Sequence, residues 1–365
     1  MRMKRIDEID SNLKVQTNIE ETDIRFLDVR QEPFKVYGLY DYKNESVFKR
    51  LPDEVAEATS EGVAYLSLNT TGGRVRFSTD SKYIAIKSIM PHVNPMSHMP
   101  LCGSAGFDMF VDEGSSSRYH ATFMPPVDMK DGYESIIRFT EPGERNITIN
   151  FPLYNCVNSL YIGLQESASV GSGAEYAYKK PILYYGSSIT QGGCASRPGN
   201  SYQAIISRRY NCDHINFGFS GSGRGEDVIV DYMSDLDISV FVCDYDHNAP
   251  NVEHLAATHE KLYKKFRSKS PLLPIVLVSM PDFDVNPADS IKRRDIIYST
   301  FMNAIRNGDK NVYYIDGESL FMGEYRDCCT VDGAHPNDIG FLRMADKIGH
   351  TVGQILAKSS KDGDR

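Results

Sequence analysis

The sequence predicts two domains, an all-β domain followed by an α/β domain whose parallel sheet is covered on both faces. The chain has 365 residues, more than one hydrophobic core usually organises. Apolar and polar residues alternate over short segments of the first half. In the second half, short apolar runs alternate with longer amphipathic segments, which is typical of a parallel sheet flanked by helices. We place the domains at 1–170 and 178–358, and expect a disordered tail at 359–365.

Five segments of the first half have an apolar residue at every second position. Alternation with period two places one face of a strand in a core. Turn residues such as Thr71–Gly73 and Glu141–Gly143 separate these segments. Many short strands without intervening helices predict a β-sandwich of the jelly-roll kind. The five expected strands are 73–78, 82–89, 106–112, 146–151 and 159–164.

A stretch of small residues, Val170–Ala174, predicts a linker or loop before the second domain. The last helix of that domain is the clearest element, because its apolar residues recur at spacings of three and four and form one stripe. Ligands of such parallel sheets bind beyond the carboxyl ends of the strands. The expected strands are 181–185, 214–216, 240–242, 275–278 and 312–315, and the expected helices are 200–209, 252–267, 290–306 and 338–357.

Composition excludes several functions. The formal net charge is −9, so we expect no nucleic-acid partner. The seven cysteines are odd in number and contain no Cys-x-x-Cys pair, which indicates free thiols and not a disulfide framework. No apolar segment follows the basic residues at the start, and no run reaches the roughly 18 apolar residues of a membrane helix. We expect a cytoplasmic protein without a membrane partner.

A serine lies where the first strand of the second domain ends. The segment Tyr185–Gly192 passes from an apolar strand into small residues and includes Ser188. Serine is a weak nucleophile and requires a base, an orienting acid and donors for the oxyanion. The segment suits the presentation of a nucleophile at the sheet edge. The alternative is an ordinary turn in which serines cap a helix.

An aspartate and a histidine three residues apart precede the final helix. Gly333 and Pro336 constrain the loop that carries Asp332 and His335, so the two side chains can come within hydrogen-bonding reach. The alternatives are a turn-capping aspartate beside a surface histidine, and a metal site. No second histidine lies at ligand spacing in this segment. We therefore expect neither a metal nor an organic cofactor.

Two further polar segments follow strands at the same edge. Asn216–Gly223 is rich in glycine, so its backbone can approach a ligand closely. Asp244–Pro250 contains Asn248, an uncharged side-chain donor, and His247 beside it. A glycine-rich turn alone usually serves only to turn the chain. Four such segments at one edge favour an active site.

These segments, taken in order, resemble the four motif blocks of the SGNH hydrolases, also called GDSL-like esterases. The resemblance covers roughly residues 180–357 and implies a flavodoxin-like three-layer α/β/α domain. It implies a catalytic triad of Ser188, Asp332 and His335. It also implies an oxyanion hole formed by the N–H of Ser188, the N–H of Gly221 and the side chain of Asn248.

The sequence departs from this family at two points. Ser187 stands where the family usually has an aspartate, and Asp246–Ala249 stands where it usually has Gly-x-Asn-Asp. The stretch Gly192–Tyr202 is similar to a two-domain bacterial group within the family. The start of that group's N-terminal β-domain resembles Val36–Tyr40 through Arg50–Pro52. This second resemblance covers nearly the whole chain.

The two-domain resemblance implies an esterase that removes short acyl groups, acetyl above all, from carbohydrates. The substrate is then a small-molecule or oligosaccharide ester. The alternatives are an acyltransferase that uses the same triad, and a carbohydrate-binding protein without catalysis. Strand edges of the β-domain also leave room for a homo-oligomer. The candidate substrate contacts are Arg197, Asn200, Tyr202 and His247, with His92, His98 and Tyr154 from the β-domain.

Overall fold

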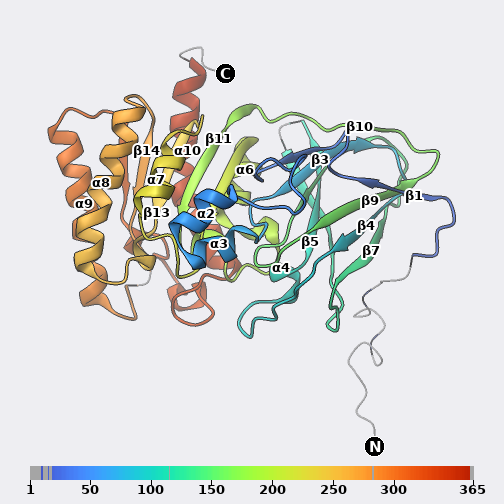
Figure 1. Cartoon of the computed structure of the whole chain (residues 1–365), viewed down its shortest axis with the longest axis horizontal. Helices are drawn as coiled ribbons and strands as arrows, with labels where there is room; N and C mark the ends of the chain where they lie inside the picture. Colours follow the sequence, from blue (N-terminus) through green and yellow to red (C-terminus); the bar gives the residue numbers. More distant parts are fainter. Residues whose placement is uncertain (1–9, 11–14, 16–18, 115, 282, 362–365) are drawn as a thin grey trace, which may run out of the picture.

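The computed structural model describes residues 10, 15, 19–114, 116–281 and 283–361. A β-rich part, on the right in Figure 1, lies beside an α/β part on the left. In the described residues, no helix is long and apolar enough to cross a membrane.

The first domain contains two antiparallel sheets packed face to face. Apolar residues of both sheets, such as Ile86 and Ile162 in one and Phe77 and Ile149 in the other, form a common core. The prediction of a β-sandwich is therefore confirmed at the level of two packed sheets, and the jelly-roll connection stays a prediction. One sheet has the order β1 (Ile24–Asp28), β9 (Ser159–Gln165), β4 (Tyr83–Ile89), β7 (Gly132–Arg138). The other has the order β10 (Val170–Ser172), β3 (Arg74–Thr79), β8 (Arg145–Asn150), β5 (Phe107–Glu113), β6 (Ser116–Phe123), and β2 (Lys35–Tyr37) also pairs with β3.

The five strands expected in this half are present as β3, β4, β5, β8 and β9. Strand β6 escaped the sequence analysis because most of its residues are exposed or half-buried. The prediction of a first half without helices is wrong, since it contains α2 (Asp53–Thr59), α3 (Glu61–Ser67) and α4 (Leu101–Ser104). Ala56 and Val63, from α2 and α3, belong to a core of the second domain.

The expected linker is partly a strand. Residues Val170–Ser172 form β10 and pair with Phe77–Thr79 of β3, which corrects the prediction of an irregular segment. The pairing gives the backbone of these small residues hydrogen-bond partners that composition cannot reveal.

The second domain is a three-layer α/β/α structure. Its five strands are all parallel, and counted from the first strand of the domain their order is 2-1-3-4-5, which is the flavodoxin-like order. The strands are β11 (Tyr178–Gly186), β12 (Cys212–Gly218), β13 (Val240–Asp244), β14 (Ile275–Val278) and β15 (Val312–Ile315). The helices are α5 (Ser188–Gln191), α6 (Tyr202–Tyr210), α7 (Asp227–Ser234), α8 (Val252–Lys269), α9 (Pro287–Arg306) and α10 (Asp338–Lys361).

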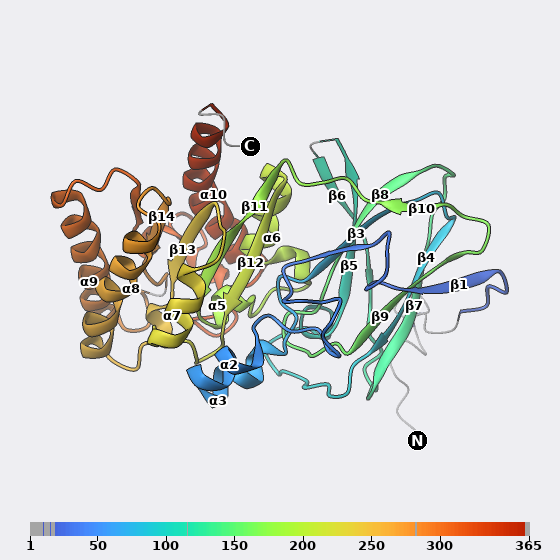
Figure 2. The same cartoon turned by 45° about the horizontal axis from the view of Figure 1, so that its top comes forward.

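Helices cover both faces of this sheet (Figures 1 and 2). Alternate residues of β11 point to opposite faces, so Tyr184 packs with α6 and α10 while Tyr185 packs with α7 and α8. The four expected helices are present as α6, α8, α9 and α10, and α7 was not expected. Helix α10 continues to Lys361, so the predicted tail is wrong over residues 359–361, and the rest of it lies outside the described residues.

Polar side chains fill the contact between the two domains. Arg74 and Arg76 alternate with core residues along β3, yet they are 1% and 3% exposed because that face of the sheet packs on the second domain. Arg74 donates to the carbonyl oxygen of His214 in β12 at 3.0 Å. The alternation of β3 thus separates an apolar core from a buried polar interface, and not from solvent.

Candidate active site

The nucleophile candidate lies in a tight turn after the central strand. Strand β11 ends at Gly186, where a Cβ atom would lie 2.3 Å from the carbonyl oxygen of Asp244, so only glycine fits. The Ser187 hydroxyl accepts from the N–H of Ile189 at 3.2 Å and caps α5. Ser188 is the first residue of that short helix and lies at the carboxyl edge of the sheet.

The structure brings Ser188, His335 and Asp332 together. Ser188 Oγ lies 3.0 Å from Nε2 of His335, and His335 Nδ1 lies 2.7 Å from Oδ2 of Asp332. Because Nδ1 faces a carboxylate, the neutral ring carries its proton there and leaves Nε2 as an acceptor for the serine proton. The three groups form one continuous hydrogen-bonded chain.

The electrostatics of Asp332 suit the orienting acid. Partial burial raises the pKa of this carboxyl, but hydrogen bonds from the N–H and ring of His335 and the N–H of Ala334 outweigh it and lower the pKa to about 2. The two backbone bonds, at 2.8 and 3.1 Å, both reach Oδ1. Asp332 is therefore ionised at neutral pH and stabilises a protonated imidazole.

The loop of Asp332 and His335 is closed on itself. Thr330 and Pro336 form an isolated β-bridge across it, and Gly333 adopts φ +90°, a conformation that favours glycine. The carbonyl oxygen of Pro336 also accepts from the N–H of Cys194 at 2.7 Å. These contacts hold the loop against the segment that follows the nucleophile.

Two backbone N–H groups are available beside the serine. Within the part of the chain that the structure describes, the N–H groups of Ser188 and Gly221 donate to no protein acceptor. Gly221 has φ +63° in the glycine-rich turn, and the N–H of Ser220 donates to Oε1 of the buried Gln191 at 2.9 Å. Gln191, which sequence reasoning did not single out, therefore ties the glycine turn to α5.

The side chain of Asn248 makes other hydrogen bonds than expected. Its Nδ2 donates to the carbonyl oxygen of Phe219 at 2.8 Å and to that of Ser222, with further contacts at 3.3 Å to those of Gly186 and Gly223. The two N–H bonds of this amide are thus turned to protein carbonyls, and they hold the glycine turn against β11. A role in the oxyanion hole stays a prediction. His247, its neighbour in the same single turn of helix, is half-buried.

The substrate contacts expected near the start of α6 contact other parts of the protein. Tyr202 is fully buried, with its hydroxyl 3.4 Å from Oδ2 of Asp244, so the expectation that it borders a pocket is wrong. Arg197 forms an ion pair with Asp108 of the β-domain at 2.8 Å. Asn200 donates to Asp338, the first residue of α10, at 2.8 Å. Arg197 and Asn200 therefore link the segment at the start of α6 to the β-domain and to α10.

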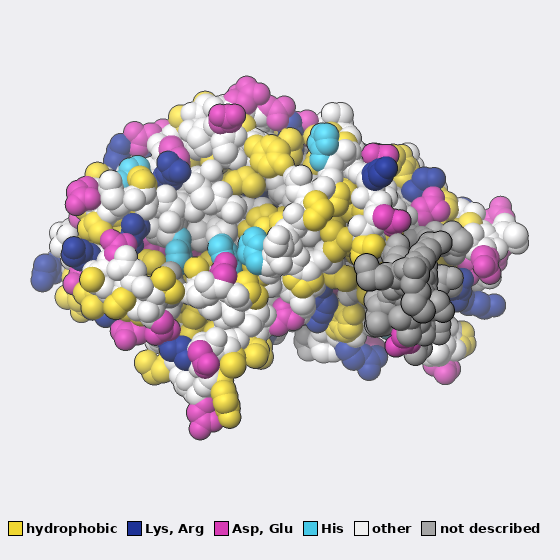
Figure 3. All heavy atoms as spheres, turned by 90° about the horizontal axis from the view of Figure 1, so that it is seen from below, with side chains coloured by type: hydrophobic (Ala, Val, Ile, Leu, Met, Phe, Trp, Pro, Cys, Tyr) yellow, Lys and Arg dark blue, Asp and Glu magenta, His cyan; other side chains and the backbone are white. Residues whose placement is uncertain are grey.

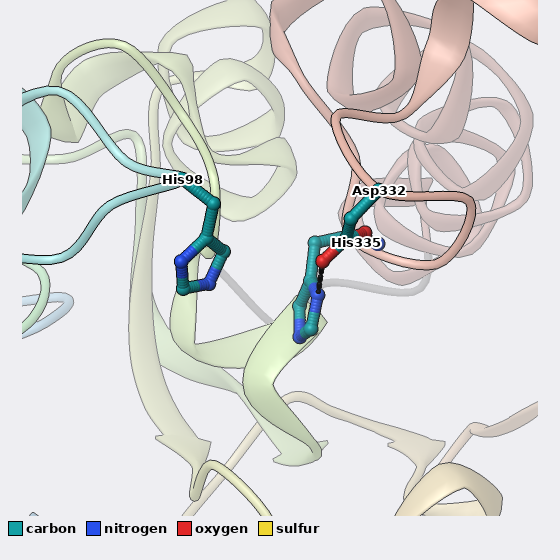
Figure 4. A group of neighbouring side chains, drawn as sticks. All are labelled: His98, Asp332 and His335. Atoms are coloured by element: carbon teal, nitrogen blue, oxygen red, sulfur yellow. Dashed lines mark hydrogen bonds and ion pairs between the residues drawn. The ribbon is translucent and has the colours of Figure 1, made fainter.

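The β-domain reaches the triad with two side chains. The rings of His98 and His335 meet edge to face, with centroids 5.5 Å apart (Figure 4). The buried hydroxyl of Tyr154 donates to the carbonyl oxygen of Ser188 at 3.1 Å, and burial raises the pKa of this phenol, which keeps it protonated. His92 is exposed in the segment that also carries His98. Figure 3 shows histidine side chains gathered near the middle of one face of the molecule.

The same cluster contains potential metal ligands. One ligand atom each of His98, Asp332 and His335 lie within 4.8 Å of one another. The segment that contains Asp332 and His335 has no second histidine at ligand spacing, which was the reason to expect no metal. In the structure, His98 of the other domain lies beside it. Both ring nitrogens of His335 already face Ser188 and Asp332. The arrangement therefore fits proton transfer directly.

Comparisons with known proteins agree with this architecture. The family model for the N-terminus of SGNH-hydrolase-type esterases matches residues 24–170. The model for the GDSL-like lipase/acylhydrolase family matches residues 179–352. Among curated proteins, none matches the chain.

Solved structures extend the likeness to the whole chain. A protein from Bacteroides ovatus assigned as a GDSL-like lipase is 26% identical, with TM-score 0.82, and the match covers 92% of this chain and 98% of that one. A salicylyl-acyltransferase from a tetracycline biosynthetic pathway is 20% identical, with TM-score 0.73 and coverage of 92% and 98%. A family two carbohydrate esterase from Clostridium thermocellum, in complex with cellohexaose, is 13% identical, with TM-score 0.61 and coverage of 89% and 99%.

Residues 179–352 belong to the GDSL-like lipase/acylhydrolase family, and the protein is an SGNH-type ester hydrolase. It is a two-domain member, in which the N-terminal domain of SGNH-type esterases precedes the hydrolase domain.

Proposed function

We propose that the protein is a serine esterase that removes short acyl groups, acetyl above all, from carbohydrates. The observation that carries this proposal is the hydrogen-bonded chain from Ser188 through His335 to Asp332, with distances of 3.0 and 2.7 Å. Such a chain activates a serine hydroxyl, which is otherwise a weak nucleophile.

The reaction proceeds in two acyl-transfer steps. His335 takes the proton of Ser188 as its oxygen attacks the ester carbonyl, and returns that proton to the leaving alcohol. Asp332 stabilises the imidazolium between these events. The N–H groups of Ser188 and Gly221 stabilise the oxyanion, and each such donor contributes on the order of 3 kcal/mol to the transition state. Water, activated by His335, then releases the acid and restores the serine.

The family and its neighbours in fold support the proposed substrate class. The Clostridium thermocellum enzyme is a carbohydrate esterase in complex with cellohexaose, and an acetyl xylan esterase from Butyrivibrio proteoclasticus shares the fold at TM-score 0.55. The β-domain adds His98 beside the triad, so a sugar can contact both domains. This supports an acylated sugar or oligosaccharide as the substrate.

Hydrolysis of p-nitrophenyl acetate, butyrate and octanoate by wild type and Ser188→Ala tests the proposal. We expect the highest kcat/KM on acetate and a loss of several orders of magnitude in the variant, because removal of a triad nucleophile leaves only residual catalysis. Ser187→Ala is a matched control, since its hydroxyl caps α5 and does not contact His335. Equal activity of wild type and Ser188→Ala would exclude the triad.

An acyltransferase is the second candidate, favoured by the likeness in fold to the salicylyl-acyltransferase. An alcohol then replaces water in the second step. Addition of acceptor alcohols to the acetate assay discriminates the two reactions. An ester product that forms faster than free acetate would favour transfer.

A further inference from the structure

A small cavity lies between the two domains, away from the triad. Its lining includes Arg76 and Asp112 of the β-domain, and Arg208 and His214 of the hydrolase domain. His214 lies near the start of β12, whereas Ser188 follows the end of β11, so cavity and triad occupy opposite ends of one sheet. The cavity volume is about 30 Å³, which is room for one or two particles of the size of water.

One positive charge among the described side chains around the cavity has no negatively charged partner. Two of the lining arginines have carboxylate partners, because Arg74 pairs with Asp213 and Arg76 pairs with Asp112. In the described ranges, the Arg208 guanidinium has no carboxylate partner; it donates to the carbonyl oxygen of Gly199 and stacks 4.3 Å from the ring centroid of Phe110. Burial lowers the pKa of Arg208 to about 10, and it is still protonated at neutral pH.

His214 is an uncharged side chain at the cavity. Burial, with contributions from Arg74 and Arg208, lowers the pKa of its imidazole well below the ordinary value. The ring is therefore neutral and carries one N–H donor.

Buried nitrogens of the described side chains at the cavity lack hydrogen-bond partners. Nε and Nη1 of Arg76, and Nδ1 of His214, have no hydrogen-bond partner among the residues that the structure describes. The two side chains are only 3% and 2% exposed. Guanidinium groups donate and never accept, so the missing partner of Arg76 is an acceptor.

We propose that the cavity binds a small monovalent anion of the chloride type, held by Arg76, Arg208 and His214. The unpaired donors require an acceptor, and the single uncompensated cation requires one negative charge. The volume of about 30 Å³ suits an ion of about the size of one or two water molecules. Because the ligands come from both domains, the bound anion stabilises the contact between them.

Anomalous diffraction from wild-type crystals soaked in sodium bromide locates the anion directly. We expect a bromide peak in the cavity, between Arg76 and His214. A cavity that contains only water under these conditions would overturn the proposal. This measurement uses the unaltered protein and does not depend on the folding of a variant.

Thermal unfolding in sodium chloride and in sodium gluconate, at equal ionic strength, measures the effect on stability. We expect chloride to raise the Tm of wild type by about 2–4 °C in a saturating manner. Arg208→Gln should lose this chloride-specific rise, and the exposed control Arg306→Gln should retain it. The same rise in all three proteins, or none in wild type, would contradict the proposal.

Discussion

Two carboxylates near the same sheet edge have opposite protonation behaviour. Asp332 receives hydrogen bonds from two backbone N–H groups and an imidazole, and its pKa falls to about 2. Asp244 is fully buried, and desolvation, with the charge of Asp246, raises its pKa to about 8. Among the described residues, its carboxyl accepts side-chain hydrogen bonds from the hydroxyls of Thr190 and Tyr202. At pH 7, Asp332 is thus charged, while Asp244 is a neutral acid in the core.

Asp244→Asn should therefore change how stability depends on pH. The unfolded chain releases the Asp244 proton near pH 4, but the folded chain retains it up to about pH 8. The stability from this group is present below about pH 4 and is lost as pH rises towards 8. Between pH 5 and 8, we expect wild type to lose stability relative to Asp244→Asn, on the order of 1 kcal/mol per pH unit.

Urea unfolding of both proteins at pH 5, 6.5 and 8 checks this expectation. The difference between them isolates Asp244 from the other titrating groups, Asp332 included. Asp237→Asn, which changes an exposed carboxylate, should differ from wild type by the same amount at each pH. A constant difference for Asp244→Asn as well would contradict the prediction.

The ring of His98, which comes from the other domain, contacts the ring of His335, and we expect it to position that ring. Edge-to-face ring contacts contribute about 1 kcal/mol beyond burial, so His98→Ala should lower kcat/KM roughly fivefold. His92→Ala is the matched control, because His92 is exposed in the same segment. Steady-state kinetics on acetate esters compare the two. Equal losses in both variants would indicate a general effect on the segment.

At the scale of elements, short turns hold the site together. Helix α5 carries the proposed nucleophile, the glycine turn carries the Gly221 N–H, and the Asp332–His335 loop carries the proposed base. Gln191 joins α5 to the glycine turn by accepting from the N–H of Ser220, and Asn248 holds that turn against the end of β11. The N–H groups proposed for the oxyanion hole are thus positioned by contacts between elements, and not by any single turn.

Asn248→Ala should lower both stability and activity. The variant leaves the buried carbonyls of Phe219 and Ser222 without this donor, at a cost of about 1–3 kcal/mol in the free energy of unfolding. Urea unfolding and kcat, measured together, check this. Unchanged stability with a loss of about a hundredfold in kcat would instead identify Asn248 as an oxyanion donor. Asn307→Ala, at an exposed position, is the control.

At the scale of the whole molecule, the β-domain supports elements that border the candidate active site. Arg50 is fully buried and donates to the carbonyl oxygens of Asn216 and Gly218 at 2.9 and 2.7 Å. It also stacks on the ring of Phe219, with 4.4 Å to the centroid. One side chain of the first domain thereby supports the strand and turn that lead to Gly221.

Arg50→Met should therefore destabilise the protein and remove activity together. It retains much of the aliphatic volume but leaves several buried carbonyls without a charged donor, which we expect to lower the free energy of unfolding by about 3 kcal/mol. Chemical unfolding and esterase assays measure both effects. Arg306→Met, an exposed arginine, should behave as wild type. A stable Arg50→Met protein with full activity would separate the site from the β-domain.

The sequence by itself determined the five strands of the hydrolase domain, four of its helices and the three triad candidates. Strands β14 and β15 match their predicted bounds, because buried parallel strands are continuous apolar runs. Asp332 and His335 are three residues apart, so their contact is local and visible in the loop motif. Local burial and local spacing leave direct signals in a sequence.

Only the tertiary structure decided which distant surfaces meet. His98 and Tyr154 reach the triad from another domain, Asn248 donates to protein carbonyls, and Tyr202 is buried in the core. The polar face of β3 is covered by the hydrolase domain. A periodic pattern reports that a face is polar or apolar, but not what covers it. That depends on the packing of the two domains, to which residues far apart in the chain contribute together.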